Sequence, residues 1–96
     1  MFPVCRITDK STYDPCGAGP RPNNQGSPNV FANFLALHTV SMRWVLHACP
    51  LAYPHGAVTV SGSLSVFVNG RPLSRVTDRI SCGSRVMVGS HNVFAG

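Results

Sequence analysis

The 96-residue sequence has few charged residues and almost no acidic ones. Only 11% of its residues are charged, compared with roughly 25% in soluble domains. Its acidic residues are Asp9, Asp14 and Asp78, and it contains no Glu. General acid–base catalysis needs well-placed titratable groups. A Cys–His nucleophile or a metal-activated water are the enzymatic alternatives, but the shortage of carboxylates argues against them, and we expect no enzyme.

Long apolar segments are missing as well. The N-terminus has no apolar signal-peptide core, and no run reaches the roughly 18 apolar residues of a membrane span. The sequence therefore predicts synthesis in a reducing cytoplasm. There, four Cys indicate a metal site more than disulfides.

Lysine is nearly absent, and arginine supplies most of the net charge of +5. A basic nucleic-acid-binding module is the obvious alternative function. However, the basic residues form no run of even three, and no known nucleic-acid motif accompanies them. We expect no nucleic-acid partner and interpret the arginines as surface or interface residues: Arg6, Arg21, Arg43, Arg71, Arg75, Arg79 and Arg85.

Turn-forming residues are abundant in this short chain. It holds nine Gly and eight Pro, which favour frequent turns and short strands over long helices. Its length allows one domain, residues 1–96, with a core small enough to need extra fastening. Four Cys and four His are the candidates for that fastening.

One hexapeptide pattern, GSxxVF, occurs three times. The copies are residues 26–31, 62–67 and 89–94. A Thr-Asp pair followed by Cys-Gly also occurs twice, at 8–9 with 16–17 and at 77–78 with 82–83. Repeats of this kind indicate one supersecondary unit used several times. We expect three imperfect repeats, approximately 5–42, 43–78 and 79–96.

The middle repeat has the clearest strand signals. Leu64, Val66 and Val68 alternate along one strand, and Asn69-Gly70 is typical of a type I′ hairpin turn. Residues 29–48 also fit helical spacing. Aligning the repeats places residues 33–38 over 69–74, which favours a strand, a turn and a strand instead. Phe34 then occupies the position of the turn glycine.

The motifs together resemble the PAAR-repeat family over nearly the whole chain. The resemblance rests on GSLSVFVNGRPLSRVTD at 62–78, the following SCG and the further GS at 89–90. Pro72-Leu73-Ser74-Arg75 stands where the family has the tetrapeptide that names it. The first repeat departs from the pattern, with Ala36-Leu37-His38-Thr39 at that place. The resemblance implies an all-β, small conical fold of three imperfect β-meander repeats, pinned by a metal near its tip.

The resemblance also implies a structural function. Such proteins cap and sharpen the C-terminal end of a trimeric β-helical spike, as a monomeric tip that briefly contacts the target membrane. Trp44 and His47 near the middle of the chain, and PNVF after the first Gly-Ser, resemble phage tail proteins more closely. The resemblance thus implies a phage tail baseplate, with the protein in the virion tail after synthesis in the host cytoplasm. The alternatives are a type VI secretion spike tip that recruits a non-covalent effector, or a small metal-dependent nucleic-acid-binding module.

Soft metal ligands gather in the middle and flanking repeats. His47, Cys49 and His55 form one run, and Cys16 and Cys82 come from the neighbouring repeats. Thiolate and imidazole suit tetrahedral Zn²⁺, although iron could use the same ligands. These five residues are candidates for about four ligand places on one metal ion. In the family, a histidine is common where Cys16 lies.

Other residues of the same types are expected to be structural. Cys5, outside the repeated context, is interpreted as a small buried hydrophobe. His38 is a packed strand residue or a further ligand candidate, and His91 a solvated turn residue. Trp44 is expected as a half-buried aromatic that covers the base of the fold, in preference to a stacking platform.

Overall fold

The computed structural model describes residues 1–13, 19–47 and 55–96, and these form short β-strands and no helix. No helix in this described part could therefore cross a membrane. The expected all-β class is confirmed. The strands are β1 (Phe2–Pro3), β2 (Phe31–Ala32), β3 (Leu35–Ala36), β4 (Arg43–His47), β5 (His55–Val58), β6 (Phe67–Val68), β7 (Arg71–Pro72) and β8 (Phe94–Ala95).

Two hairpins confirm the register expected from the repeats. β2 pairs with β3 and β6 with β7, both antiparallel. Asn33 and Phe34 have φ of 53° and 66°, and Asn69 and Gly70 have φ of 53° and 80°. Both turns thus have the two positive φ values of type I′ geometry. The strand–turn–strand prediction is correct, and the helical alternative is excluded for the described residues.

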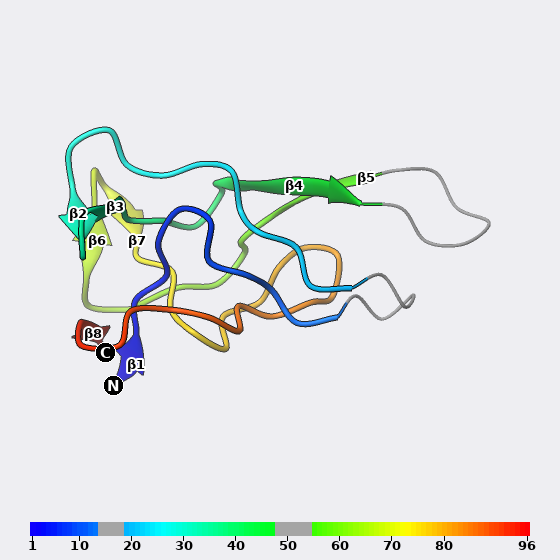
Figure 1. Cartoon of the computed structure of the whole chain (residues 1–96). Coiled ribbons are helices and arrows are strands. Elements are labelled where there is room, and N and C mark those ends of the chain that lie inside the picture. The colour runs from blue at the N-terminus through cyan, green and yellow to red at the C-terminus, as the bar shows by residue number, and fades with distance from the viewer. Residues whose placement is uncertain (14–18, 48–54) are drawn as a thin grey trace.

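A third, equivalent pair is made from the two ends of the chain. β1 pairs with β8, and the register aligns Phe2 with Ala95 and Pro3 with Phe94. Figure 1 shows N and C side by side at this pair, which lies at the same end of the molecule as the two hairpins. The backbone hydrogen bonds therefore define three units. The first spans 23–43 and the second 59–79, and the third combines 86–96 with 1–10.

The three units meet in a closed ring of backbone hydrogen bonds. Cys5 N–H donates to Ser74 O (2.9 Å), Ser74 N–H to His38 O (3.0 Å), and His38 N–H to Cys5 O (3.0 Å). All three residues are completely buried. Each unit thus gives one hydrogen bond to the next, and the ring defines a pseudo-threefold axis.

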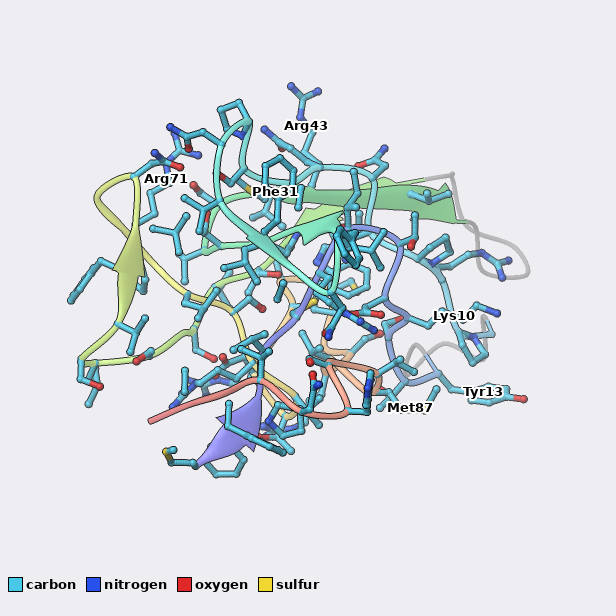
Figure 2. All side chains as sticks on the ribbon, turned by 60° about the vertical axis from the view of Figure 1, so that its left-hand side comes forward. Lys10, Tyr13, Phe31, Arg43, Arg71 and Met87 are labelled. Atoms are coloured by element: carbon cyan, nitrogen blue, oxygen red, sulfur yellow. The ribbon has the colours of Figure 1, made fainter. Side chains whose placement is uncertain are left out.

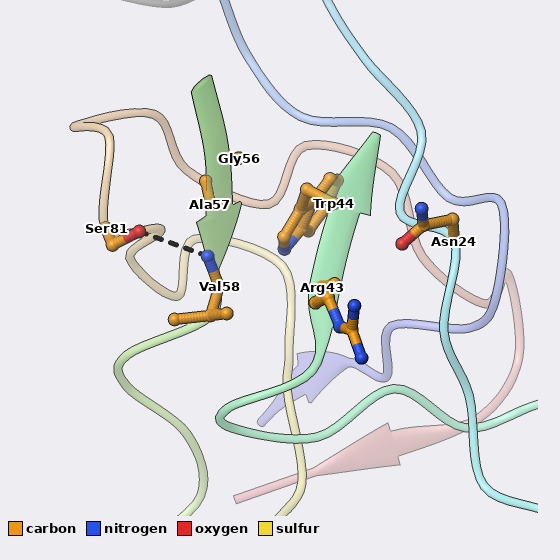
Figure 3. A pocket seen from close by; sticks show the side chains of 7 residues that line it. All are labelled: Asn24, Arg43, Trp44, Gly56, Ala57, Val58 and Ser81. Carbon is orange, nitrogen blue, oxygen red and sulfur yellow. Dashed lines mark hydrogen bonds between the residues drawn. The ribbon is translucent and has the colours of Figure 1, made fainter. Parts of the chain in front are cut away.

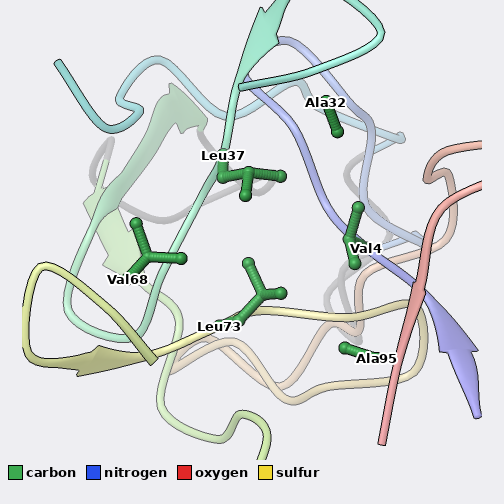
Figure 4. Close-up of a cluster of buried hydrophobic side chains, with 6 residues drawn as sticks. All are labelled: Val4, Ala32, Leu37, Val68, Leu73 and Ala95. Atoms are coloured by element: carbon green, nitrogen blue, oxygen red, sulfur yellow. The ribbon is translucent and has the colours of Figure 1, made fainter. Parts of the chain in front are cut away.

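Two small apolar layers lie along this axis. The layer under the hairpins is built from Val4, Leu37, Leu73, Ala32, Val68 and Ala95. Figure 4 shows these six side chains converging from three sides. The second layer contains Cys5, Trp44, Ala57, Ile80 and Val86. Burying a Val or Leu side chain contributes roughly 1.5–3 kcal/mol, so a core of this size stabilises a short chain only modestly.

The longest strands form a separate hairpin. β4 and β5 pair antiparallel, with Arg43 opposite Val58, Trp44 opposite Ala57, and an irregularity before His47 pairs with His55. In Figure 1 this hairpin extends away from the end that carries β1, β2, β3, β6, β7 and β8. The molecule is accordingly longer in one direction, at 39 × 23 × 22 Å.

The glycine of each GSxxVF copy lies against the return strand of its unit. A Cβ at Gly26 would be 2.6 Å from Ala36 Cβ. At Gly62 it would be 2.9 Å from Leu73 O, and at Gly89 it would be 2.7 Å from Val4 O. Real Cβ atoms do not approach backbone this closely, so the pattern requires glycine here for space and not for φ.

We predict that Gly89→Ala destabilises the protein by about 1–3 kcal/mol, because the new methyl must displace the backbone at Val4. Thermal and urea melts measure this change. Gly19→Ala is the matched control: its Cβ would meet only Arg21 Nη1, at 3.8 Å. That variant should stay within about 0.5 kcal/mol of the parent. Equal melts for the two variants would contradict the close approach.

Candidate docking surface and metal-ligand positions

The serine of each GSxxVF copy closes its own turn. In all three copies the serine Oγ accepts hydrogen bonds from the backbone N–H groups two and three residues later, at 2.9–3.2 Å. Side-chain hydroxyls that bond the local backbone in this way favour turns. The repeated serine therefore sets the bend from which the next strand starts.

The same three hydroxyls join each unit to its neighbour. Each donates to an oxygen at the hairpin-turn position of another unit. The contacts join Ser27 Oγ to Asn69 Oδ1, Ser63 Oγ to Gly96 O, and Ser90 Oγ to Asn33 Oδ1. Since the order is cyclic, the loops at this end form one connected ring instead of three independent hairpins.

The outer side of this ring carries exposed aromatic residues at equivalent positions. Phe31, Phe67 and Phe94 are 57%, 55% and 48% exposed. The next residue of each strand faces the core, as the alternation of a β-strand requires. Figure 2 shows the side chains at this end, with Phe31 and Arg71 labelled. We call this outer side, defined by Phe31, Phe67 and Phe94, the base face.

The base face is a candidate docking surface. Single exposed apolar residues are common on protein surfaces and need no explanation. Here, however, three exposed aromatics occupy equivalent positions about the pseudo-threefold axis. The base face can therefore present the same contact three times to a partner with matching symmetry.

Two arginines form ion pairs within the fold. Arg6 pairs with Asp9 (Nε to Oδ2, 2.9 Å) and Arg75 with Asp78 (Nη2 to Oδ1, 3.0 Å). In each pair the aspartate also accepts the arginine's backbone N–H, at 2.8 and 2.7 Å. The sequence interpretation noted the Thr-Asp pairs but missed the arginines. The repeated tetrapeptide R-x-T-D at 6–9 and 75–78 is the signal that would have found them.

The structure describes the predicted metal ligands only in part. Cys16 and Cys49 lie outside the described residues, and nothing is described of the side chains of His47 and His55. The backbone nevertheless places His47 and His55 as direct partners across β4 and β5. Among the side chains that the structure describes, no three Cys, His or acidic groups lie together. The metal site stays a prediction.

Cys82 is the one predicted ligand whose side chain is described. It is half-buried and its thiol donates weakly to Ser84 Oγ at 3.5 Å. Cys82 also packs against the apolar layer that contains Trp44 and Ala57, residues paired across β4 and β5. Its thiol therefore lies beside the hairpin that carries His47 and His55.

His38 is a packed residue, as the first of its two interpretations states. Its Nδ1 lies 2.8 Å from Gln25 O, so it must donate there, and its Nε2 then accepts from Thr59 Oγ1 at 2.8 Å. Thr59 Oγ1 in turn accepts from Trp44 Nε1 at 2.9 Å. Both ring nitrogens are used, and burial lowers the pKa of His38 to about 4.

The other structural expectations have mixed outcomes. Cys5 is fully buried as expected, and this burial raises the pKa of its thiol. His91 is exposed, as a solvated turn residue should be. The expectation for Trp44 is wrong: the indole is 3% exposed and sits in the second core layer. Its N–H donates to the buried Thr59 hydroxyl, so the indole is part of the core and does not cover the base.

A recess of about 520 Å³ lies beside Trp44. Figure 3 shows the residues that line this recess, most of them on β4 and β5. Among them, Val58 N–H donates a hydrogen bond to Ser81 Oγ at 3.0 Å. The described side chains that line it include Arg43 and Asn24 but no carboxylate, thiol or imidazole. These residues can hold a polar group but supply no general base.

The comparisons with known proteins agree on one family. The PAAR motif family matches residues 24–88. The chain is 39% identical over 69 residues to double-stranded DNA deaminase toxin A of Burkholderia cenocepacia, covering 72% of this chain and 5% of that protein. It is 34% identical over 44 residues to NAD(P)(+) glycohydrolase toxin Tse6 of Pseudomonas aeruginosa, covering 46% and 10%. The chain thus spans a small part of these relatives.

We predict that unfolding free energy falls by up to about 3 kcal/mol as the pH drops from 6.5 towards 4, through His38. Because its folded pKa is about 4 and its ordinary value is 6.5, the unfolded chain takes up the proton first. The stabilisation is complete above pH 6.5 and is lost below it. Urea melts across this range measure the change.

Two variants isolate this contribution from other groups that titrate. His38→Gln should flatten the dependence between pH 6.5 and 4, whereas His91→Gln, at an exposed position, should leave it as in the parent. Trp44 fluorescence gives a local readout, since the two rings lie 5.3 Å apart and edge to face. An unchanged slope in His38→Gln would contradict the assignment.

Proposed function

Because the chain belongs to the PAAR motif family, we propose that it is a structural spike tip, which caps the C-terminal end of a trimeric β-helical spike in a contractile injection machine. The observation that carries the proposal is the base face. Its phenylalanines occupy equivalent places in three units joined by a cyclic set of hydrogen bonds. A single chain can therefore match a threefold partner.

The match has a physical basis on both sides of the contact. The end of a β-helix leaves strand edges and apolar side chains without partners, which favours association. Covering them with the base face would remove the exposed part of three aromatic side chains from water; each is 48–57% exposed, and complete burial of such a side chain is worth roughly 1.5–3 kcal/mol. One tip per trimer then satisfies the geometry without any symmetric assembly of the tip itself.

The relatives bear on which type of machine we propose. The matched proteins are named as toxins of bacteria, and each contains the matching segment as 5% or 10% of its length. This supports a toxin-delivering secretion machine of the type VI kind, in preference to the phage tail suggested by the sequence. Release into the medium that depends on a contractile sheath would support it. Co-purification with virions would identify the phage tail instead.

We also propose that one metal ion, zinc or else iron, is held near the end opposite the base face. The candidate donors are Cys16, His47, Cys49, His55 and Cys82, whose thiolate and imidazole groups suit tetrahedral zinc. The pairing of His47 with His55 and the position of Cys82 beside that hairpin support the fit. Such an ion would add stability to a chain whose apolar core is small.

We predict that replacing Phe31, Phe67 and Phe94 together by Ser abolishes binding to a purified trimeric β-helical spike protein of the same organism. The three side chains are exposed in the free protein, so folding should persist. The matched control replaces three exposed apolar residues outside the base face: Val60, Met87 and Val88. Light scattering should show one tip per trimer for the parent and the control. Full binding by the phenylalanine variant would refute the docking surface.

We predict that the purified protein contains about one zinc ion per chain and that chelation lowers its melting temperature by several degrees. Cys82→Ser should reduce the metal content and the melting temperature together. Cys5→Ser should leave the metal content at the parent level, because Cys5 lies on the axis within the core. Elemental analysis measures both. A parent protein without stoichiometric metal would sink the proposal.

A further inference from the structure

Phe34 has a backbone conformation that is unfavourable for a residue with a side chain, and its exposed ring does not pack against the described part of the chain to offset this cost. It occupies the second position of the type I′ turn between β2 and β3, with φ of 66°. Glycine adopts such values freely, whereas a residue with a Cβ does not. The equivalent position of the β6–β7 turn is Gly70, with φ of 80°. Phe34 nevertheless has a side chain that is 100% exposed.

Folding alone does not account for this residue. A fully exposed ring makes no packing contribution to the chain, and the left-handed backbone lowers stability relative to glycine. Strain of this kind persists where the surroundings hold it, and it is concentrated at functional sites. The benefit of Phe34 is therefore expected in contact with another molecule.

The turn that presents Phe34 is held firmly. Asn33 Oδ1 accepts hydrogen bonds from Arg6 Nη1 at 3.2 Å and from the Ser90 hydroxyl, and Asn33 Nδ2 donates to Asn92 Oδ1 at 2.8 Å. Two other segments of the chain, one at Arg6 and one at 90–92, thus fix this turn. An anchor on such a turn loses little conformational freedom when it binds, which favours affinity.

Phe34 faces the same side as the base face. It lines a surface recess of about 510 Å³ together with Asn33 and Phe31, and Phe31 belongs to the base face. The phenylalanines at 31, 67 and 94 of this surface therefore follow the pseudo-threefold axis, whereas the residues at its three turn positions differ. One turn carries an aromatic ring, one carries glycine, and the third position is taken by the chain ends.

We propose that Phe34 is an off-axis aromatic anchor, which enters an apolar pocket that the trimeric spike repeats at each of its three corners. The inference rests on the proposed spike-tip function. One anchor against three identical pockets would hold the tip at one of three equivalent angles and resist its rotation. The phenylalanines at 31, 67 and 94 favour the same three angles, and Phe34 would add a further barrier to rotation between them.

The test measures affinity and stability in the same variant. Phe34→Gly should weaken binding to a purified trimeric β-helical spike protein of the same organism by about 10–100-fold, as for loss of an aromatic hot spot. It should also raise the melting temperature of the free tip by roughly 4–8 °C, because the strained backbone is relieved. A variant that merely unfolds would show the opposite shift in melting temperature.

A second variant tests the threefold pockets. Phe34→Gly combined with Gly70→Phe moves the ring to the equivalent corner, where a Cβ meets no atom within 4 Å. Because the spike is threefold, affinity should return to within about threefold of the parent. Loss without recovery would overturn the proposal, since the contact would then belong to one corner only.

The outcomes separate this inference from the function on which it rests. If the parent tip does not bind the spike at all, the proposed function fails. If the parent binds and Phe34→Gly binds equally well, the anchor is refuted while the spike-tip function stands. Loss in Phe34→Gly, together with recovery in the combined variant, supports both.

Discussion

The structure depends on three backbone hydrogen bonds that close into a ring among Cys5, His38 and Ser74. The residues are fully buried, and a buried backbone group left without a partner costs about 1–3 kcal/mol. The ring is therefore satisfied only when all three units are present. Outside β4 and β5 the strands have two residues each, too short to be stable as isolated hairpins. The units accordingly fold together or not at all.

The pseudo-symmetry belongs to the backbone, and the side chains at equivalent positions differ. In two units an aspartate accepts the backbone N–H three residues earlier, at 2.8 and 2.7 Å. In the first unit Met42 Sδ takes this place and accepts from Thr39 N–H at 3.3 Å. Ser41 still has φ of 71°, like the threonines that precede the aspartates. The backbone conformation of this turn is thus set by its position next to the hydrogen bonds among Cys5, His38 and Ser74. The thioether sulfur of Met42, a weaker acceptor than a carboxylate, is sufficient there.

Local signals made much of this fold predictable. The register of 33–38 over 69–74 follows from the GSxxVF copies and the Asn69-Gly70 turn, because turn chemistry acts between neighbours. The pairing of β1 with β8 was not predicted, since it joins the two ends of the chain through strands too short to leave a pattern. Burial of Trp44 depends on Thr59 and His38, which come from different units. The metal ligands remain a prediction because Cys82 is the one candidate of the five whose side chain is described.

The phenylalanines of this domain lie on its surface and not in its core, which is the opposite of the usual arrangement. All five phenylalanines of the sequence are exposed, while the layer beneath the hairpins is filled by Val, Leu and Ala. Large aromatics normally supply most of the burial in a core. Here the hydrogen-bonded ring and the serine turns hold a thin layer of small side chains in place, which leaves the aromatic area free. The free energy of burying that area is then available to association instead of folding, and the low fraction of charged residues leaves few ions to desolvate when the base face is covered.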